Sequence, residues 1–299
     1  MNALELHGLE KHYPDFALGP IDLELPGGTV CGLIGENGAG KSTTIKLILD
    51  MIDREAGTVK LFGQEEITPL AKADIGVVMG GEGIPTCLTA PQVGKVMAGI
   101  YPNWDAAAYA DWCRRFDLPE NKKYGDYSTG MKMKQCLAVA LSHHPKLLLL
   151  DEATSGLDPV VRELVKKLLV DFVAENGASV MIASHNLREL EDVCDHVGLL
   201  HRGGALCEDD LDRLKLGITR LQFALADPAD FETVRTGLNL LKCSQQGKLF
   251  EMTVRGTETE TLALVQRLHP LFCETLPITL EELFISEMEV AGYDINKVI

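Results

Sequence analysis

The chain has 299 residues, of which 46% are hydrophobic and 24% charged, a composition typical of a folded protein with one or two domains. The formal net charge of −16 argues against an autonomous nucleic-acid binder, because neutralising phosphates requires a basic surface, so no nucleic-acid partner is expected. No apolar run approaches the ~18 residues of a membrane-spanning helix. The eight cysteines include no Cys-x-x-Cys pair, which argues against a zinc or redox motif. We therefore expect a cytosolic chain.

The first sixty residues have the pattern of β structure, and a further apolar strand pattern follows them. Ile21, Leu23 and Leu25 alternate with acidic residues, as in a half-buried strand. The later segments with strand composition are Thr29–Ile34, Val59–Phe62 and Ile75–Met79. A helical composition over Ser42–Met51 separates the first two of these.

Helical patterns dominate from Thr89 to about Ser142, where Asp105 precedes a run of apolar and aromatic positions and is a candidate N-cap. Strand and helix patterns then alternate through Leu147–Leu150, Pro159–Ala174, Ser179–Ala183, Leu187–Cys194 and Val197–Leu200. This alternation predicts a largely parallel α/β core.

The tail, after a boundary near Asp209–Gly217, has a different order of elements. Strand patterns cover Leu221–Ala226, Leu240–Cys243, Lys248–Thr253 and Phe272–Thr275. Helical patterns cover Phe231–Leu238, Glu258–Arg267 and Thr279–Glu289. The order βαββαβ, followed by a last helix, predicts a split βαβ unit.

A glycine-rich segment follows Thr29–Ile34 and fits the pattern G-x-x-x-x-G-K-[ST]. Its glycines let consecutive backbone N–H groups point at phosphate oxygens, and the following helix adds its positive N-terminal end. Lys41 is expected to reach the β- and γ-phosphates, and the Ser42 hydroxyl to ligate Mg²⁺. The residues predicted to bind nucleotide are Gly35, Asn37, Gly38, Gly40, Lys41, Ser42 and Thr43. The alternative is a glycine turn ahead of a helix.

An acidic pair, Asp151-Glu152, ends the apolar run Leu147–Leu150. A carboxylate at the end of a buried strand beside a phosphate loop is positioned to hold Mg²⁺, which makes Asp151 a second metal ligand with Ser42. Glu152 is a candidate catalytic base that orients or deprotonates the attacking water. Without the phosphate loop, an acidic pair at a strand end would more often be solvated.

Further motifs occur in a fixed order around the phosphate loop: Tyr13 before it, and Tyr127-Ser128-Thr129-Gly130-Met131, Ser155-Gly156-Leu157-Asp158 and His185 after it. With these motifs, residues 3–205 resemble the nucleotide-binding subunit of an ATP-binding cassette (ABC) transporter. The ordered set is more specific than any one of its members.

The resemblance implies a role for each of these residues. Ser128 and Gly130 would hold the γ-phosphate of the nucleotide bound to the opposite subunit, and Asp158 would belong to a loop that crosses the dimer interface. His185 would contact the γ-phosphate as a catalytic residue, and Tyr13 would stack on adenine. Taken singly, a helix cap, a strand-end histidine or aromatic packing would explain the same residues.

The sequence departs from the family pattern at several positions. Gly80 stands where the family has a glutamine that contacts Mg²⁺; Glu82 is a candidate replacement ligand, with a solvated loop acid as the alternative. Thr129 and Met131 replace a glycine and a glutamine of the signature, and Ala153 replaces a proline. Because the lysine and the acidic pair are intact, ATP hydrolysis is still expected.

The segments Ile75–Val78, Asn103–Asp105 and Ser128–Lys132 resemble the ATPases of ABC-2-type exporters of Gram-positive bacteria, a branch that includes peptide exporters such as those of phenol-soluble modulins. This resemblance implies an Mg²⁺-dependent ATPase that forms an ATP-dependent homodimer and lies on the inner face of the cell membrane through a separate permease. The alternatives are a soluble ABC ATPase without a transporter partner and a small-molecule kinase.

The expected architecture is α/β: a P-loop NTPase core with an antiparallel β subdomain and a helical subdomain, plus a small α+β C-terminal extension. We expect the cassette over residues 1–210, its helical subdomain over about 80–142, and the accessory domain over 218–299. A regulatory or dimerising role for that domain and a merely stabilising one remain equal alternatives.

Overall fold

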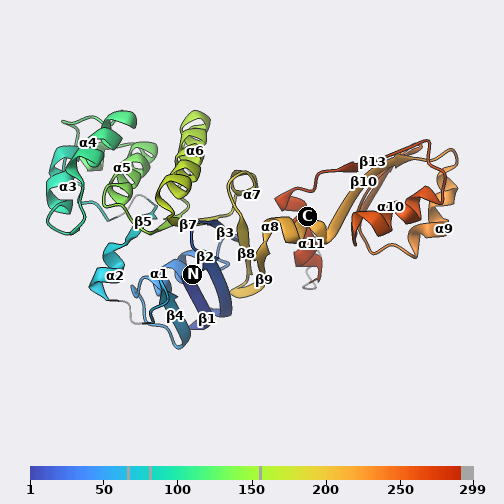
Figure 1. Ribbon diagram of the computed structural model, residues 1–299, viewed down its shortest axis with the longest axis horizontal. Helices are drawn as coiled ribbons and strands as arrows, with labels where there is room; N and C mark the ends of the chain where they lie inside the picture. Colours follow the sequence, from blue (N-terminus) through green and yellow to red (C-terminus); the bar gives the residue numbers. More distant parts are fainter. Residues whose placement is uncertain (66–67, 81–82, 155–156, 291–299) are drawn as a thin grey trace. The chain divides into compact units, whose positions relative to one another are not determined.

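The computed structural model describes residues 1–65, 68–80, 83–154 and 157–290 (Figure 1). The chain divides into two compact units, one spanning Met1–Glu208 and the other beginning at Asp209. Within the described ranges, no helix is both long enough and apolar enough to span a bilayer. The loop residues Gly81, Glu82, Ser155 and Gly156, which the sequence motifs include, lie outside the described residues.

A six-stranded sheet, parallel from β5 (Ile75–Met79) to β8 (His196–His201), forms the centre of the first unit. Its strands, in spatial order, are β5, β6 (Leu147–Asp151), β7 (Ser179–Ser184), β3 (Val30–Ile34), β8 and β9 (Gly204–Asp210). From β5 to β8 each strand pairs in parallel with the next. β3, β6 and β7 are buried along their whole length, as strands covered on both faces must be. The predicted parallel α/β core is confirmed.

An antiparallel sheet forms the β subdomain of this unit, in the order β2 (Phe16–Pro26), β1 (Asn2–Tyr13) and β4 (Ala56–Leu61). Leu4, Leu6 and Leu9 of β1 are fully buried and belong to one hydrophobic core with Leu33 of β3 and Leu149 of β6. Burying a leucine side chain contributes ~1.5–3 kcal/mol. This core therefore holds in place the strands that precede the phosphate loop and the acidic pair.

Helices flank the strands of the first unit. They are α1 (Lys41–Ile48), α2 (Pro69–Ala73), α3 (Ala90–Met97), α4 (Ala106–Arg115), α5 (Thr129–Leu141), α6 (Pro159–Asn176) and α7 (Leu187–Leu190), with a 3-10 turn η1 (Tyr124–Asp126). Asp105 caps α4 as predicted, accepting hydrogen bonds from the backbone N–H groups of Ala107 and Ala108 at 2.9 Å. α1 packs against β6 and β7, α5 against β5, and α6 against β7. Figure 1 shows α3, α4 and α5 grouped as a helical subdomain.

The second unit is built around an antiparallel sheet in the order β11 (Leu240–Gln246), β12 (Leu249–Arg255), β10 (Ile218–Ala224) and β13 (Phe272–Leu276). Its helices are α8 (Leu211–Leu216), α9 (Glu232–Arg235), α10 (Glu258–Gln266) and α11 (Leu280–Val290), with a 3-10 turn η2 (Pro228–Phe231). From β10 to β13 the elements follow the predicted split βαβ order. In its core, Phe250 stacks on Phe223 with ring centroids 5.3 Å apart and contacts Phe231 at 4.9 Å.

The structure differs from the sequence predictions at short elements. β9 and α8 occupy residues 204–216, where the sequence predicted no strand or helix and placed a boundary near Asp209–Gly217. Asp210 caps α8 by accepting a hydrogen bond from the Arg213 N–H at 3.0 Å. α7 ends at Leu190 instead of Cys194, whose N–H donates to Leu190 O at 3.0 Å within a turn. Elements this short contain too few residues for hydrophobic periodicity to reveal their ends.

A buried histidine makes the stability of the first unit depend on pH. His143, which follows α5, stacks on Tyr101 with ring centroids 4.0 Å apart, and its Nδ1 lies 3.1 Å from the Ala73 carbonyl oxygen. Burial lowers the pKa of the His143 imidazole to about 4, whereas an unfolded chain has a histidine pKa of about 6.5. The unfolded state therefore binds more protons between these two values. The free energy of unfolding should fall by up to about 3 kcal/mol as the pH falls from 6.5 to 4.

Urea unfolding at a series of pH values, followed by tryptophan fluorescence, measures this loss, because both tryptophans (Trp104 and Trp112) belong to the first unit. A His143→Phe variant keeps an aromatic ring against Tyr101 but cannot titrate, so its free energy of unfolding should vary less over the same range. An unchanged pH dependence in this variant would contradict the assignment.

Candidate active site

The phosphate loop connects the end of β3 to the first residue of α1. Gly38 and Gly40 have φ values of +84° and +110°, a region that L side chains rarely adopt. The Ala39 N–H donates to the Glu36 carbonyl oxygen at 3.1 Å and closes the loop. The loop thus leads into the N-terminus of α1, where backbone N–H groups favour anions.

Contacts with the end of β8 hold the phosphate loop in place. A Cβ added at Gly35 would lie 2.5 Å from the Leu200 carbonyl oxygen, so the backbone needs a glycine there. The Glu36 carboxylate accepts a hydrogen bond from the Arg202 N–H at 3.2 Å and lies 2.8 Å from His201 Nδ1. Sequence reasoning assigned no role to His201, because its partner is distant in the chain.

The Lys41 side chain lies across this loop. Its ammonium donates to the carbonyl oxygens of Gly35 at 2.7 Å and Glu36 at 3.2 Å, and it lies 3.8 Å from Glu152 Oε1. Burial lowers the pKa of the Lys41 ammonium, while the carboxylates of Glu152, Asp151 and Glu36 oppose this shift. These carboxylates favour the charged lysine beside the loop that is predicted to receive phosphate.

Asp151 ends β6 next to the start of α1. Burial raises the pKa of its carboxyl group, and a hydrogen bond with the Ser42 side chain opposes that shift. Its Oδ1 is buried and has no hydrogen-bond partner within the part of the chain that the structure describes. A buried carboxylate oxygen of this kind is a ready ligand for a cation.

Glu152 is joined to the end of β7 by its backbone and by its side chain. Its N–H donates to the Ala183 carbonyl oxygen at 2.9 Å, and its Oε1 lies 2.8 Å from His185 Nδ1. Glu152 has a φ of +51°, a left-handed conformation that costs roughly 1–2 kcal/mol in a residue with a side chain. Strained backbone of this kind is concentrated at functional sites. Lys41, Ser42, Asp151, Glu152 and His185 therefore form one cluster.

The other predicted site residues have local structural contacts. Ser128 caps α5 by accepting a hydrogen bond from the Met131 N–H at 3.3 Å, and Gly130 lies in the first turn of that helix. Asp158 caps α6 through the Val161 N–H at 3.0 Å. Tyr13 is 42% exposed at the end of β1.

The departures from the family motif have clear places in the structure. Gly80 follows β5 with a φ of +55°, and its N–H donates to the Asp151 carbonyl oxygen at 3.4 Å. Its backbone thus contacts the metal-ligand candidate where the family has a glutamine side chain. Thr129 is exposed at the start of α5, and Ala153 is buried after Glu152.

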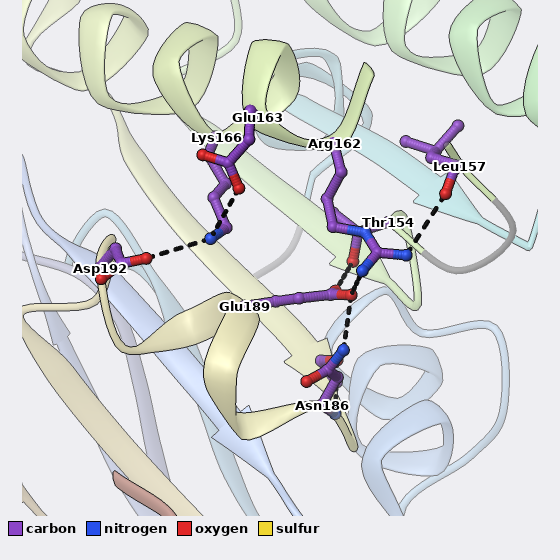
Figure 2. Close-up of polar contacts among 9 residues, drawn as sticks. Thr154, Leu157, Arg162, Glu163, Lys166, Asn186, Glu189 and Asp192 are labelled. Atoms are coloured by element: carbon purple, nitrogen blue, oxygen red, sulfur yellow. Dashed lines mark hydrogen bonds and ion pairs between the residues drawn. The ribbon is translucent and has the colours of Figure 1, made fainter. Parts of the chain in front are cut away.

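A polar network around Glu189 lies beside this cluster and was missed by sequence reasoning. Figure 2 shows this network. The Glu189 carboxylate accepts hydrogen bonds from Thr154 and Asn186 and pairs with Arg162. The spacing of Asn186 and Glu189 is that of a helix cap and its third residue, which would predict a local capping pair. Nothing in the local pattern points to Arg162 or Thr154 as partners.

A glycine-rich phosphate loop between a parallel strand (β3) and a helix, with an acidic pair at the end of β6, which β7 separates from β3 in the sheet, defines a P-loop nucleotide hydrolase. Residues 18–155 match the family model described as ABC transporter. The chain belongs to the family of ATP-binding subunits of ABC transporters and is an ATPase. ATPases of this family work as dimers with membrane permease partners.

Individual relatives agree with this family. The chain is 32% identical to the ABC transporter ATP-binding protein YtrB of Bacillus subtilis (strain 168), with 95% of this chain and 97% of that protein covered. It is 34% identical to the bacitracin transport ATP-binding protein BcrA of Bacillus licheniformis, with 79% and 84% covered. A dimeric ATP-binding cassette solved in a post-hydrolysis state with ADP and phosphate has a TM-score of 0.62 at 21% identity, covering 70% of this chain and 98% of that one.

The phosphate loop should tolerate alanine at Gly38 better than at Gly40. Both glycines have positive φ, so alanine is strained at either position by roughly 1 kcal/mol. A Cβ at Gly40 would also lie 2.3 Å from Leu18 Cδ1, whereas at Gly38 no described atom lies within 4 Å. Leu18 is fully buried and cannot move away freely. Gly40→Ala should therefore lower the free energy of unfolding by about 2–4 kcal/mol, and Gly38→Ala by about 1 kcal/mol. Equal losses in urea unfolding would contradict this packing argument.

Proposed function

We propose that this ATPase powers an ABC-2-type membrane exporter whose substrates are peptides. The observation that carries the proposal is the cluster in which Lys41, Asp151, Glu152 and His185 surround the N-terminus of α1. This cluster contains the groups that ATP hydrolysis requires. Support for a peptide substrate comes from the similarity to a bacitracin transport protein over most of both chains.

ATP binds with its phosphates in the loop that runs from Gly35 to Lys41. The loop N–H groups and the N-terminus of α1 donate to phosphate oxygens, and the Lys41 ammonium exchanges its carbonyl partners for the β- and γ-phosphates. Asn37, Ser42 and Thr43 complete this set of contacts. Tyr13 is sufficiently exposed to stack on the adenine ring.

The donor set around Ser42 fits Mg²⁺. The Ser42 hydroxyl and the buried Asp151 Oδ1, which has no hydrogen-bond partner among the described residues, are oxygen ligands of the kind that Mg²⁺ prefers. Among the described residues there is no cluster of three or more acidic, histidine or cysteine side chains suited to a metal. Mg²⁺ commonly uses one or two protein oxygens together with phosphates and water. When bound, the ion neutralises charge on the β- and γ-phosphates.

Glu152 accepts a proton from the water that attacks the γ-phosphorus, while the bond from phosphorus to the ADP oxygen breaks and orthophosphate leaves. His185, held 2.8 Å from Glu152 Oε1, orients this carboxylate and contacts the γ-phosphate. The strained backbone of Glu152 and its hydrogen bond to Ala183 keep the carboxylate at the strand end.

Two copies of this chain bind two ATP molecules between them. Ser128 and Gly130 begin α5, so their hydroxyl and N–H groups suit the γ-phosphate bound to the other copy. Asp158 and the loop before it lie at the contact between copies. The dimeric arrangement of a solved cassette of the same fold supports this model.

The permease contacts the region Gly80–Asp105 and keeps the ATPase on the cytoplasmic face of the cell membrane. A groove of about 850 Å³ lies between α3 and α4, and its lining includes the exposed small residues Ala98, Ala106 and Ala110. Small side chains let the backbone of another helix approach closely. This groove is suited to receive a short helix of the permease.

Replacing Glu152 with glutamine should slow turnover at least about 100-fold, because the amide cannot accept the proton from water. ATP affinity should be retained, and the ATP-bound dimer should accumulate in size-exclusion chromatography. Lys41→Ala, in contrast, should weaken the binding of a fluorescent ATP analogue itself. Wild-type turnover by Glu152→Gln would rule out this role for the carboxylate. Phosphate transfer to a small acceptor instead of orthophosphate release would favour the kinase alternative.

A composite site makes activity depend on both copies. Ser128→Arg and Lys41→Ala should each lose nearly all turnover, but a mixture of the two variants should regain part of it, because a mixed dimer contains one site without either substitution. Orthophosphate release measures this recovery. Ser244→Arg, an exposed serine in β11, is the control and should leave turnover unchanged. Full activity of Ser128→Arg alone would exclude the composite site.

A further inference from the structure

A buried carboxylate lies beside the catalytic cluster without belonging to it. Glu189 is in α7 and is only 7% exposed. Acidic side chains are almost never buried unless they are paired, because leaving water costs a carboxylate several kcal/mol. The contacts of Glu189 therefore indicate what this carboxylate holds together.

The donors to Glu189 come from three separate segments (Figure 2). The Thr154 hydroxyl donates to Oε2 from the segment after β6. The Asn186 side-chain amide donates to Oε1 at 2.7 Å from the segment after β7, and Arg162 Nη1 of α6 lies 2.8 Å from the same oxygen. Arg162 also donates through Nη2 to the Leu157 carbonyl oxygen at 3.3 Å.

Each of these segments also contains a proposed site residue. Thr154 is two residues after Glu152, Asn186 directly follows His185, and Leu157 directly precedes Asp158. The carboxylate of Glu189 thus ties together the chain segments that present the catalytic base and its histidine partner. These contacts are made through Thr154 and Asn186, which lie close to Glu152 and His185 in the chain.

The charges of Glu189 and Arg162 strengthen the bonds that join these segments. Hydrogen bonds to an ionised carboxylate are about twice as strong as neutral ones. The Glu189 side chain is 8% exposed and that of Arg162 30%, so losing the arginine leaves a buried carboxylate less well compensated. Moving one segment away from Glu189 therefore carries a cost. Glu152 and His185, which lie 2.8 Å apart, belong to two of the segments that this network joins.

We propose that Glu189 is a positioning residue for ATP hydrolysis, which couples the segment after β6 to the segment after β7 so that Glu152 and His185 act as a pair. This inference rests on the proposed roles of Glu152 and His185. It assigns to Arg162, Thr154 and Asn186 the task of orienting these segments, without contact with ATP.

The test compares kcat with nucleotide affinity in the full chain. Glu189→Gln keeps the shape of the side chain but loses the charge that pairs with Arg162, so kcat should fall roughly tenfold while affinity for a fluorescent ATP analogue changes less than about twofold. A loss confined to affinity, or no change in either quantity, would overturn the proposal.

The neighbouring ion pair provides a matched control. Lys166 of α6 pairs with Asp192 at 3.2 Å, so it also joins α6 to the segment that follows α7, and Figure 2 shows it beside the Glu189 network. The Asp192 side chain is 73% exposed, however, and the pair bonds to neither catalytic segment. Asp192→Asn should leave kcat and affinity unchanged. A tenfold fall in kcat with Asp192→Asn would show that any ion pair from α6 to the region of α7 affects turnover. That result would overturn the specific role of Glu189.

Further variants keep the test decisive if Glu189→Gln folds poorly. Thr154→Val removes one hydrogen-bond donor to Glu189 and should lower kcat several-fold. Thr154→Ser keeps the hydroxyl and should retain the wild-type kcat. In a double-mutant cycle, Glu189→Gln should have little further effect on the residual kcat of His185→Ala, because it acts through the pairing of His185 with Glu152. Additive losses would overturn the proposal. If Glu152→Gln itself keeps full turnover, the proposed function fails; if it loses turnover while Glu189→Gln and Thr154→Val do not, only this inference fails.

Discussion

Parallel pairing of β6, β7 and β3 is the constraint on which the active site depends. In a parallel sheet the carboxyl ends of the strands meet at one edge, so residues that follow different strands converge there. The register places Asp151 opposite Ala183 of β7, and Ala183 opposite Leu33 of β3. The phosphate loop, the acidic pair and the histidine segment therefore begin at the same level of the sheet, although the chain separates them widely.

The positive potential that the site needs for phosphate is opposite in sign to the net charge of the whole protein. A chain with a formal net charge of −16 must bind the anionic phosphates of ATP, so local groups have to supply the attraction. Oriented N–H groups of the loop, the N-terminus of α1 and the Lys41 ammonium do this over short distances. The carboxylates beside Lys41 oppose the lowering of its pKa by burial, and the same acids are the candidates for metal binding and proton transfer.

Local patterns predicted the parts of the structure whose causes are local. The glycine spacing of the phosphate loop, the Asp105 cap and the alternation of strands and helices each depend on residues that are neighbours in sequence. The short elements β9, α7 and α8 were missed or misjudged, because their ends are set by contacts and not by periodicity. The contact of Glu36 with His201 and the network around Glu189 were missed for the same reason: their partners belong to other elements.

The sequence by itself determined which chemical groups this protein can use: a phosphate loop, a lysine, an acidic pair and a histidine in an order typical of ABC ATPases. It also determined an α/β cassette followed by a split βαβ unit, because hydrophobic periodicity and turn residues act locally. Only the tertiary structure decided which of these groups meet, since strand order and register follow from packing across the whole core. It also decided that a buried carboxylate, inconspicuous in the sequence, holds the segments of the catalytic pair together, because burial forces an acid to find its partners wherever the fold supplies them.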